Sequence, residues 1–235
     1  SNLQNRRTAL ISSLLFLFFP IHVEAVTSIV GRGELLVFLF FALAFYVVQQ
    51  RYYKAAAVSF LLSLFSKETG VAFIPVFLFF EFVWRKETVA NLLKKVLFFV
   101  PPLIIYAAFR YNALGLEYFI HADAYSFFNP IAAMDFWPGL WTAFKVLCLY
   151  VQKTIFPTYF SSDYSFDQIA AVHNLFNSWQ AAAGITIFVA LIYLFVAKRD
   201  NLVGLGAVIF LFPYLVISNL FIKTGTIMAE RLVYM

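Results

Sequence analysis

Long apolar runs separated by short charged breaks dominate the chain. Within these runs, apolar and polar residues do not alternate as they do in the strands of a membrane barrel, so each run predicts a helix. Several runs hold only 12 to 14 residues, whereas a simple helical span needs about 20. Such short runs indicate helices packed inside a bundle, with polar ends that face a cavity. The eight runs are 8–21, 35–48, 55–66, 71–84, 96–109, 139–156, 181–197 and 202–222.

The composition indicates the class of protein. Apolar residues make up 63% of the chain and charged residues 12%, against about 25% charged residues in a soluble domain. A soluble fold cannot cover so much apolar surface with so few charges. We therefore expect an all-α, polytopic transmembrane helical bundle, a single domain over 1–235 that is part of a longer protein. Nucleic-acid binding is not expected, because the 17 basic residues are spread along the chain and form no stripe.

The charged residues fall into two sets that predict the sidedness of the protein. The positive-inside rule places the set with a basic excess in the cytoplasm. The other set then faces the lumen or the periplasm. The cytoplasmic set comprises Arg6, Arg7, Arg51, Lys54, Arg85, Lys86, Lys94, Lys95, Lys198 and Arg199 with Glu81, Glu87 and Asp200. The outer set comprises Arg32, Lys67, Arg110, Lys145, Lys153, Lys223 and Arg231 with Glu24, Glu34, Glu68, Glu117, Asp123, Asp135, Asp163, Asp167 and Glu230.

One run is difficult to place. Three runs follow the cytoplasmic Lys94–Lys95 before the chain returns to the cytoplasm at Lys198–Arg199, and three crossings cannot end on the side where they began. The run 139–156 carries two lysines and a glutamine, so we predict that it lies along the outer interface or re-enters. The loops 111–138 and 157–178 are then outer loops. In the alternative, 139–156 spans the membrane and 111–138 is cytoplasmic.

Ionisable residues of the outer set beside apolar segments are candidates for a site, because such groups are costly in a membrane. His22 and Glu24 follow Pro20 at the outer end of the first helix and can move a proton. Nearby, Arg32 can bind a phosphate with its planar fork. The alternative is a helical corner in which Arg32 pairs with Glu24 or Glu34.

Three further segments carry candidate residues. Lys67 and Glu68 separate two short runs, where the alternative is a solvated turn. Glu230 and Arg231 follow the last run, and adjacent helical residues do not face each other, which argues against a mutual salt bridge. Asp163, among hydroxyl side chains, can bind a sugar or instead cap a helix.

Together, these segments resemble the transmembrane and tetratricopeptide-repeat O-mannosyltransferases, and they occur in that family's order. The string PIHVEAV at 20–26 with Gly31-Arg32 is similar to one motif, although Phe19 stands where the family usually has His. The string SKETG at 66–70 resembles a second motif. Asn129-Pro130 with 156–165 resembles a loop region, and 218–234 resembles the motif that carries a Glu-Arg pair, with Met235 where Leu-Pro-Ser begins in the family.

The resemblance implies a GT-C fold and an enzyme, a membrane glycosyltransferase. Such an enzyme moves a sugar from a polyprenyl- or dolichyl-phosphate donor to Ser or Thr hydroxyls of a protein acceptor, on the lumenal or periplasmic side. The membrane would be the endoplasmic reticulum in a eukaryote and the inner membrane in a bacterium, with membrane lipids around the bundle. The resemblance also implies that a first outer loop with an acidic pair, which includes the general base, and the tetratricopeptide repeats lie outside this chain.

On these terms each candidate residue has an expected role. We expect the clusters to line one outward-facing pocket, with at least one ion pair between clusters. No metal site is assigned, because the three histidines show no metal-ligand spacing. The lipid-linked sugar is expected as a substrate, no cofactor is assigned, and dependence on a divalent metal stays open. Donor-phosphate binding is expected from Arg32, Lys67 and Arg231, contributions to catalysis from His22, Glu24, Glu68 and Glu230, and contact with the acceptor or sugar from Asp163 and Tyr164.

A polytopic transporter and a non-catalytic membrane scaffold are the alternatives. Charges inside the membrane fit a transporter as well. Many transporters contain matching halves with broken helices, and this sequence shows no matching halves. On the scaffold alternative, the outer set is only surface and its members have no reason to meet.

Overall fold

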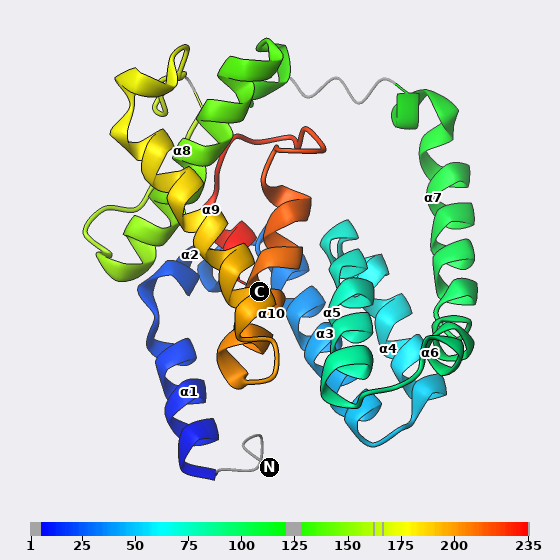
Figure 1. The fold of residues 1–235 in the computed structure, drawn as a ribbon. Coiled ribbons are helices and arrows are strands. Elements are labelled where there is room, and N and C mark those ends of the chain that lie inside the picture. The colour runs from blue at the N-terminus through cyan, green and yellow to red at the C-terminus, as the bar shows by residue number, and fades with distance from the viewer. Residues whose placement is uncertain (1–5, 121–127, 162, 166, 235) are drawn as a thin grey trace. The chain divides into compact units, whose positions relative to one another are not determined.

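A computed structural model describes residues 6–120, 128–161, 163–165 and 167–234, with side chains left out at 116–120. These residues form helices and connecting segments and contain no strand, which confirms the all-α prediction. Each of the eight apolar runs contains a helix. The chain divides into two compact units (Figure 1). The first unit comprises 1–31 and 124–234, and the second unit comprises 32–123.

The second unit is built on a helical hairpin. Its two helices are joined by a tight turn at Arg51, whose φ is 65°, and α3, α4 and α5 lie side by side (Figure 1). Their shared interior is aromatic: the Phe77 and Phe99 ring centroids lie 4.7 Å apart, and Phe73 lies 5.5 Å from Phe99. Each buried ring of this kind contributes a large apolar area to the core of the unit. The elements are α3 (Arg32–Gln49), α4 (Tyr53–Ser66), η3 (Glu68–Ala72), α5 (Phe73–Phe79), η4 (Phe80–Trp84), α6 (Val89–Val96) and α7 (Val100–Ile120).

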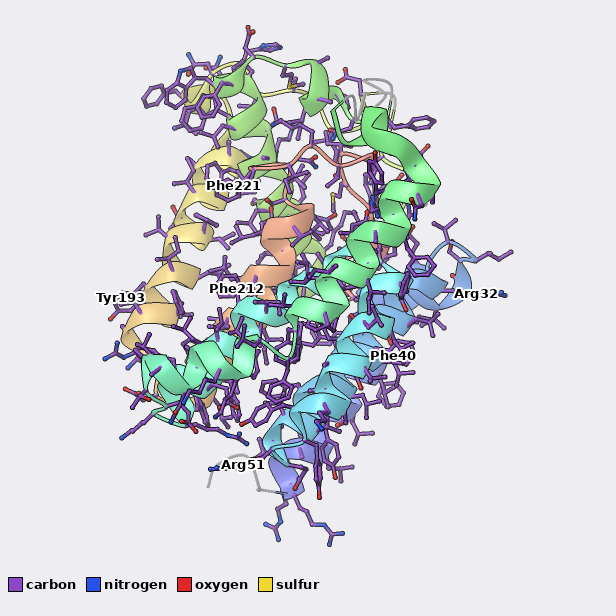
Figure 2. The ribbon with its side chains drawn as sticks, turned by 90° about the vertical axis from the view of Figure 1, so that its right-hand side faces the viewer. Arg32, Phe40, Arg51, Tyr193, Phe212 and Phe221 are labelled. Atoms are coloured by element: carbon purple, nitrogen blue, oxygen red, sulfur yellow. The ribbon has the colours of Figure 1, made fainter. Side chains whose placement is uncertain are left out.

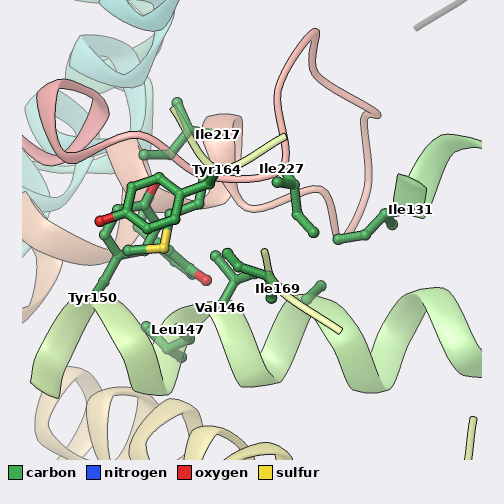
Figure 3. Packing of buried hydrophobic residues seen from close by; sticks show 11 residues of the cluster. Ile131, Val146, Leu147, Tyr150, Tyr164, Ile169, Ile217 and Ile227 are labelled. Atoms are coloured by element: carbon green, nitrogen blue, oxygen red, sulfur yellow. The ribbon is translucent and has the colours of Figure 1, made fainter. Parts of the chain in front are cut away.

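The first unit packs α8 against α9, and α9 against α10. Its core is a cluster of aliphatic and tyrosine side chains above α8, among them Leu147, Tyr150 and Tyr164 (Figure 3). Residues from far along the chain, Ile217 and Ile227, complete this cluster. The elements are α1 (Arg6–Phe18), η2 (Pro20–His22), α2 (Val23–Thr27), η5 (Pro130–Ala133), α8 (Phe136–Ile155), η6 (Leu175–Asn177), α9 (Trp179–Ala197), α10 (Leu202–Ile217) and η7 (Glu230–Val233).

Three helical stretches in the described residues are long and apolar enough to cross a membrane: α3, Val89–Gly115 and α9. A fourth is formed if α1 and Pro20–Thr27, bent by 54°, count as one span. These helices support a membrane protein. The helix α8 is not among them, and the prediction that it lies along the outer interface stays a prediction.

The predicted loop 111–138 needs a correction. The helix α7 continues to Ile120 and α8 already begins at Phe136, so much of this range is helical, and 121–127 lies outside the described residues. The prediction ended the helix with the apolar run 96–109, just before Arg110, but a charge alone does not stop a helix. A kink follows only at Gly115, whose φ of 72° suits glycine. In the loop 157–178, by contrast, the described residues include only the short helix η6.

Within the second unit, the two charged sets lie at opposite ends, as the sequence predicts. At one end, Arg85 donates to the carbonyl oxygens of Val48 and Gln49, at 3.0 and 2.7 Å, where α3 stops. The outer-set residue Glu34 lies in the first turn of α3. A helix of 18 residues is about 27 Å long, and Figure 2 shows Arg32 and Arg51 at its two ends.

The segment η4 is a π-helix. Its register is seen in the hydrogen bond from the Arg85 nitrogen to the Phe80 carbonyl, at 3.1 Å, five residues back instead of four. This extra residue lies directly before the charged end of the unit.

The contact between α8 and α9 predicts the effect of one glycine substitution. A Cβ at Gly184 would lie 1.8 Å from the Phe144 carbonyl oxygen, so Gly184→Ala forces the two helices apart. We expect a loss of about 1–3 kcal/mol, as for other overpacked positions, measured as a lower thermal unfolding midpoint in detergent. Gly206→Ala is the matched control, because no atom lies within 4 Å of its Cβ. Equal midpoints for the two variants would contradict this packing.

Candidate active site

The candidate site of the first unit forms where a helical corner meets the segment 227–233. Pro20 has no N–H and ends α1, and η2 and α2 turn away from it by 54°. The segment is fixed by Tyr150 on α8, whose buried hydroxyl donates to the Ala229 carbonyl at 3.0 Å and accepts from the Ala229 nitrogen at 3.1 Å. This double contact places η7, which follows directly, against α2.

The contact between these elements is an ion pair. The Arg231 guanidinium donates from Nη1 to Glu24 Oε1, and the Arg231 backbone nitrogen donates to Glu24 Oε2 at 3.0 Å. Both side chains are largely shielded from solvent. Arg231 thus pairs with a residue 207 positions away, and not with its neighbour Glu230. The predicted ion pair between two clusters is present.

Glu230 is the most buried acid of this site, with 1% of its surface exposed. Its Oε1 accepts a hydrogen bond from the Tyr164 hydroxyl and lies 3.6 Å from Lys153 Nζ. Its Oε2 is buried and has no hydrogen-bond partner among the described residues. Burial raises the pKa of Glu230 above its ordinary value, because desolvation disfavours the carboxylate. Burial and the hydrogen bond to Glu230 also raise the pKa of Tyr164.

The sequence places Lys153 in the outer set, where it is expected to point to the outer interface or to the cavity, but gives it no role in the site. Its Nζ donates to the Tyr159 carbonyl and lies 5.3, 5.6 and 5.1 Å from the ring centroids of Tyr159, Phe160 and Tyr164. Aromatic faces stabilise a cation at such distances. A lysine held by rings and by a glutamate is part of the site. The feature of the sequence that could have indicated Lys153 is its position in 139–156, the least apolar of the long runs.

His22 lies beside this cluster. Its ring centroid is 4.4 Å from that of Phe16 and 4.8 Å from that of Tyr234. Its Nδ1 is buried without a hydrogen-bond partner among the described residues. His22 is thus held by ring packing rather than by Glu24.

Asp163 caps its own turn. Its carboxylate accepts from the Ser165 nitrogen at 2.9 Å and from the Ser165 hydroxyl at 2.7 Å, which is the capping alternative. These bonds lower the pKa of Asp163. Its neighbour Tyr164 points into the buried cluster, and the role of both residues toward an acceptor or sugar stays a prediction.

The remaining candidates lie in the second unit. Lys67 donates to Glu34 Oε1, and Glu34 is buried, so Lys67 does not pair with its neighbour Glu68. Glu68 is largely exposed and lies 3.5 Å from Arg110 Nη1. Arg32 is exposed and forms no ion pair among the described residues. Because these residues lie in a different unit, the single pocket lined by all clusters stays a prediction.

Sequence reasoning also missed a buried pair of asparagines. Asn129 Nδ2 donates to Asn219 Oδ1 at 2.8 Å and to the Thr224 carbonyl at 2.7 Å. Asn219 has a φ of 58°, a left-handed conformation that asparagine tolerates. Both residues lie in motifs of the resemblance, and the structure gives them a supporting role for the segment that leads to Glu230.

Comparisons with known proteins agree with the resemblance. The chain is 25% identical over 230 residues to protein O-mannosyl-transferase F38B6.6 of Caenorhabditis elegans, covering 95% of this chain and 32% of that protein. It is 25% identical over 285 aligned positions to human protein O-mannosyl-transferase TMTC4, covering 97% of this chain and 36% of that protein. A stretch of 41 residues, 17% of this chain and 4% of the relative, is 54% identical to mouse protein O-mannosyl-transferase TMTC3. No family model and no solved structure matches.

The fold and the site define a helical membrane protein with a paired and largely buried charge cluster. The relatives confirm the resemblance to one family: the curated homologues of this chain are protein O-mannosyltransferases, which are glycosyltransferases. The chain spans about a third of the length of the curated relatives that it matches over most of its own length.

The Glu24–Arg231 pair can be measured by a double-mutant cycle. Because both side chains are largely shielded, we expect Glu24→Gln and Arg231→Gln to be coupled by about 1–2 kcal/mol in the free energy of unfolding, below the upper range for charged hydrogen bonds. Denaturant titration in detergent provides the measurement. The cycle of Glu24→Gln with Lys198→Gln is the control and should be additive.

The buried Glu230 predicts a pH dependence with a definite sign. Its pKa lies above the ordinary 4.5 in the folded protein, so above pH 4.5 the folded state holds more protons than the unfolded state. The contribution of Glu230 to the free energy of unfolding therefore falls as the pH rises from 4.5 through the raised pKa. As the pH rises through this window, the thermal unfolding midpoint of the wild type should fall relative to that of Glu230→Gln.

Asp163→Asn is the control of opposite sign. The bonds from Ser165 lower the pKa of Asp163 below 3.8, so its stabilising contribution is present above pH 3.8 and is lost as the pH falls through the lowered pKa. If the wild type and Glu230→Gln show the same pH dependence of the unfolding midpoint, Glu230 ionises normally.

Proposed function

We propose that this chain is part of a membrane protein O-mannosyltransferase that transfers mannose from a polyprenyl- or dolichyl-phosphate donor to Ser or Thr hydroxyls of a protein acceptor. One observation carries the proposal: the Glu24–Arg231 pair joins the first and last motifs of the resemblance, 207 residues apart, in a chain whose relatives match it almost throughout. A scaffold has no need for this convergence. The reaction would take place on the lumenal or periplasmic face, in the endoplasmic reticulum membrane or a bacterial inner membrane.

The donor phosphate requires cations in a partly dry site, where charge-assisted hydrogen bonds are strong. A guanidinium has five N–H donors, and Arg231 uses one side-chain nitrogen for Glu24, so donors remain for a phosphate. Glu24 holds the guanidinium in place before the donor arrives. In the second unit Glu34 holds Lys67 in the same way, and the exposed Arg32 is the third proposed phosphate ligand.

Transfer breaks the bond between the sugar carbon and the phosphate oxygen, and forms a bond from that carbon to the acceptor oxygen. The acceptor hydroxyl must lose its proton during this step. Among the described residues, Glu230 is suited to orient that hydroxyl, because its buried Oε2 has no partner there. Tyr164 and Lys153 fix its other oxygen. In the neighbouring η2, the buried Nδ1 of His22 has no hydrogen-bond partner among the described residues. The general base itself is assigned to no residue of this chain.

The test is sugar transfer by the full-length protein, purified in detergent, from polyprenyl-phosphate mannose to a Ser/Thr acceptor peptide. We expect Arg231→Ala and Glu68→Ala each to lower transfer, and Arg231→Ala to do so by about 10²-fold, as when one charge-stabilising donor is removed. Insertion into the membrane should be intact. Lys198→Ala is the matched control, because Lys198 belongs to the cytoplasmic set.

Two outcomes would contradict the proposal. Absence of transfer by the wild type under conditions where a related mannosyltransferase is active would favour the scaffold or the transporter. Normal transfer by Arg231→Ala would show that the cluster around Glu24 is structural only.

A further inference from the structure

The end of the second unit that carries cytoplasmic-set residues has a surplus of positive charge. Its two acids are both engaged. Glu81, with none of its surface exposed, accepts from Arg85 at 2.9 Å and from Lys95 at 2.5 Å, and Glu87 accepts from Lys95 at 2.7 Å. The end holds Arg51, Lys54, Arg85, Lys86, Lys94 and Lys95 against Glu81 and Glu87, a net charge of +4.

The surplus is exposed. Lys54, Lys86 and Lys94 are exposed, and no acid lies within 4.0 Å of them among the described residues. Each is a chain neighbour of a residue in one contact network, in which the Lys95 Nζ lies 5.1 Å from the Tyr53 ring and Arg85 donates to the Tyr53 hydroxyl at 3.1 Å. A surface of this kind attracts anions.

An apolar groove of about 290 Å³ begins at this end, between α4 and α7. The two helices run in the same direction, because Phe65 contacts Tyr106 and Phe109 further along both of them. The groove follows α4 for about 10 Å, two turns of helix. Lys54 provides its one charged group, and the other lining residues are Ala57, Val58, Leu61, Phe98, Pro101, Pro102 and Ile105.

The groove is open on the side of a candidate span. Val58 is 60% exposed and Ile105 41% exposed, and Val89–Gly115, which provides one wall, is long and apolar enough to cross a membrane. In a bilayer such a surface is covered by hydrocarbon. An inorganic anion at Lys54 would make no contact with the apolar groove, and an apolar helix would leave Lys54 without a counter-charge.

We propose that this groove is a binding site for an anionic phospholipid of the cytoplasmic leaflet, with one acyl chain between α4 and α7 and the phosphate on Lys54. The headgroup also lies in the field of the exposed Lys94 and Lys86. The cytoplasmic leaflet is rich in anionic lipids, which matches the side that the positive-inside rule gives to these residues. The site is independent of sugar transfer and would anchor the second unit at a fixed depth.

The test counts lipids that remain bound to the full-length protein in detergent, by native mass spectrometry, without any sugar donor. Palmitoyl-oleoyl phosphatidylglycerol is the probe, and phosphatidylcholine with the same chains is the comparison. We expect a preference for the anionic lipid. Lys54→Gln should weaken its binding about fivefold, the factor that one basic residue contributes near an anionic surface, whereas Lys198→Gln should leave binding unchanged.

Further arms separate the headgroup from the chain. Val58→Trp fills the groove and should abolish retention of the anionic lipid in a protein with an unchanged unfolding midpoint. Soluble glycerol phosphate should not compete. Equal retention of both lipids, full retention in Lys54→Gln, or competition by glycerol phosphate would overturn the proposal. If Val58→Trp unfolds, the wild type decides. Absence of any retained lipid in the wild type would also overturn the proposal, because another helix then covers the groove.

Discussion

The first unit depends on the ion pair by which Arg231 holds Glu24. Both groups belong to short helical turns, α2 and η7, that are too short to be stable by themselves. Tyr150 supplies the second attachment, since its hydroxyl bonds both polar groups of Ala229. With these contacts, two turns from distant parts of the chain become one rigid site. Removal of either contact would free a segment whose neighbours, Ile227 and Met228, are buried in the core.

The same requirement governs the other charges near apolar segments. An isolated charge in such surroundings is costly, and the second unit satisfies this requirement by pairing Glu34 with Lys67 and Glu81 with two bases. Glu230 differs, because one of its oxygens stays without a described partner and its pKa rises. Stability alone would favour a satisfied carboxylate. An unsatisfied carboxylate beside an engaged arginine is typical of a site where polar chemistry takes place.

The sequence was sufficient for the helices but not for the partners of the charges. Apolar runs locate helices because burial of side chains drives their formation, and the positive-inside rule separated the two ends of the second unit. The partners of Lys67 and Arg231 were not readable, since an ion pair depends on which turns pack together. The place of Lys153 in the site was missed for the same reason, because the aromatic rings that surround it come from a loop that folds back on α8. The loop was predicted to start at 111 because the charge of Arg110 was taken to end the helix. In the structure Arg110 contacts Glu68 and Tyr106, and α7 continues past it.

The π-helix at Phe80–Trp84 determines how this region tolerates changes in length. Its wider turn rotates every residue after Phe80 relative to an α-helix, and in this register Arg85 donates to Glu81 and to the last carbonyl groups of α3. Loss of one residue here would restore ordinary helical pitch and turn the arginine by about 100°. The aromatic residues that precede the π-helix would still face α3 and α4, whereas the charged residues that follow it would no longer face their partners. Insertions and deletions are therefore more harmful within these five residues than in the turn that follows them.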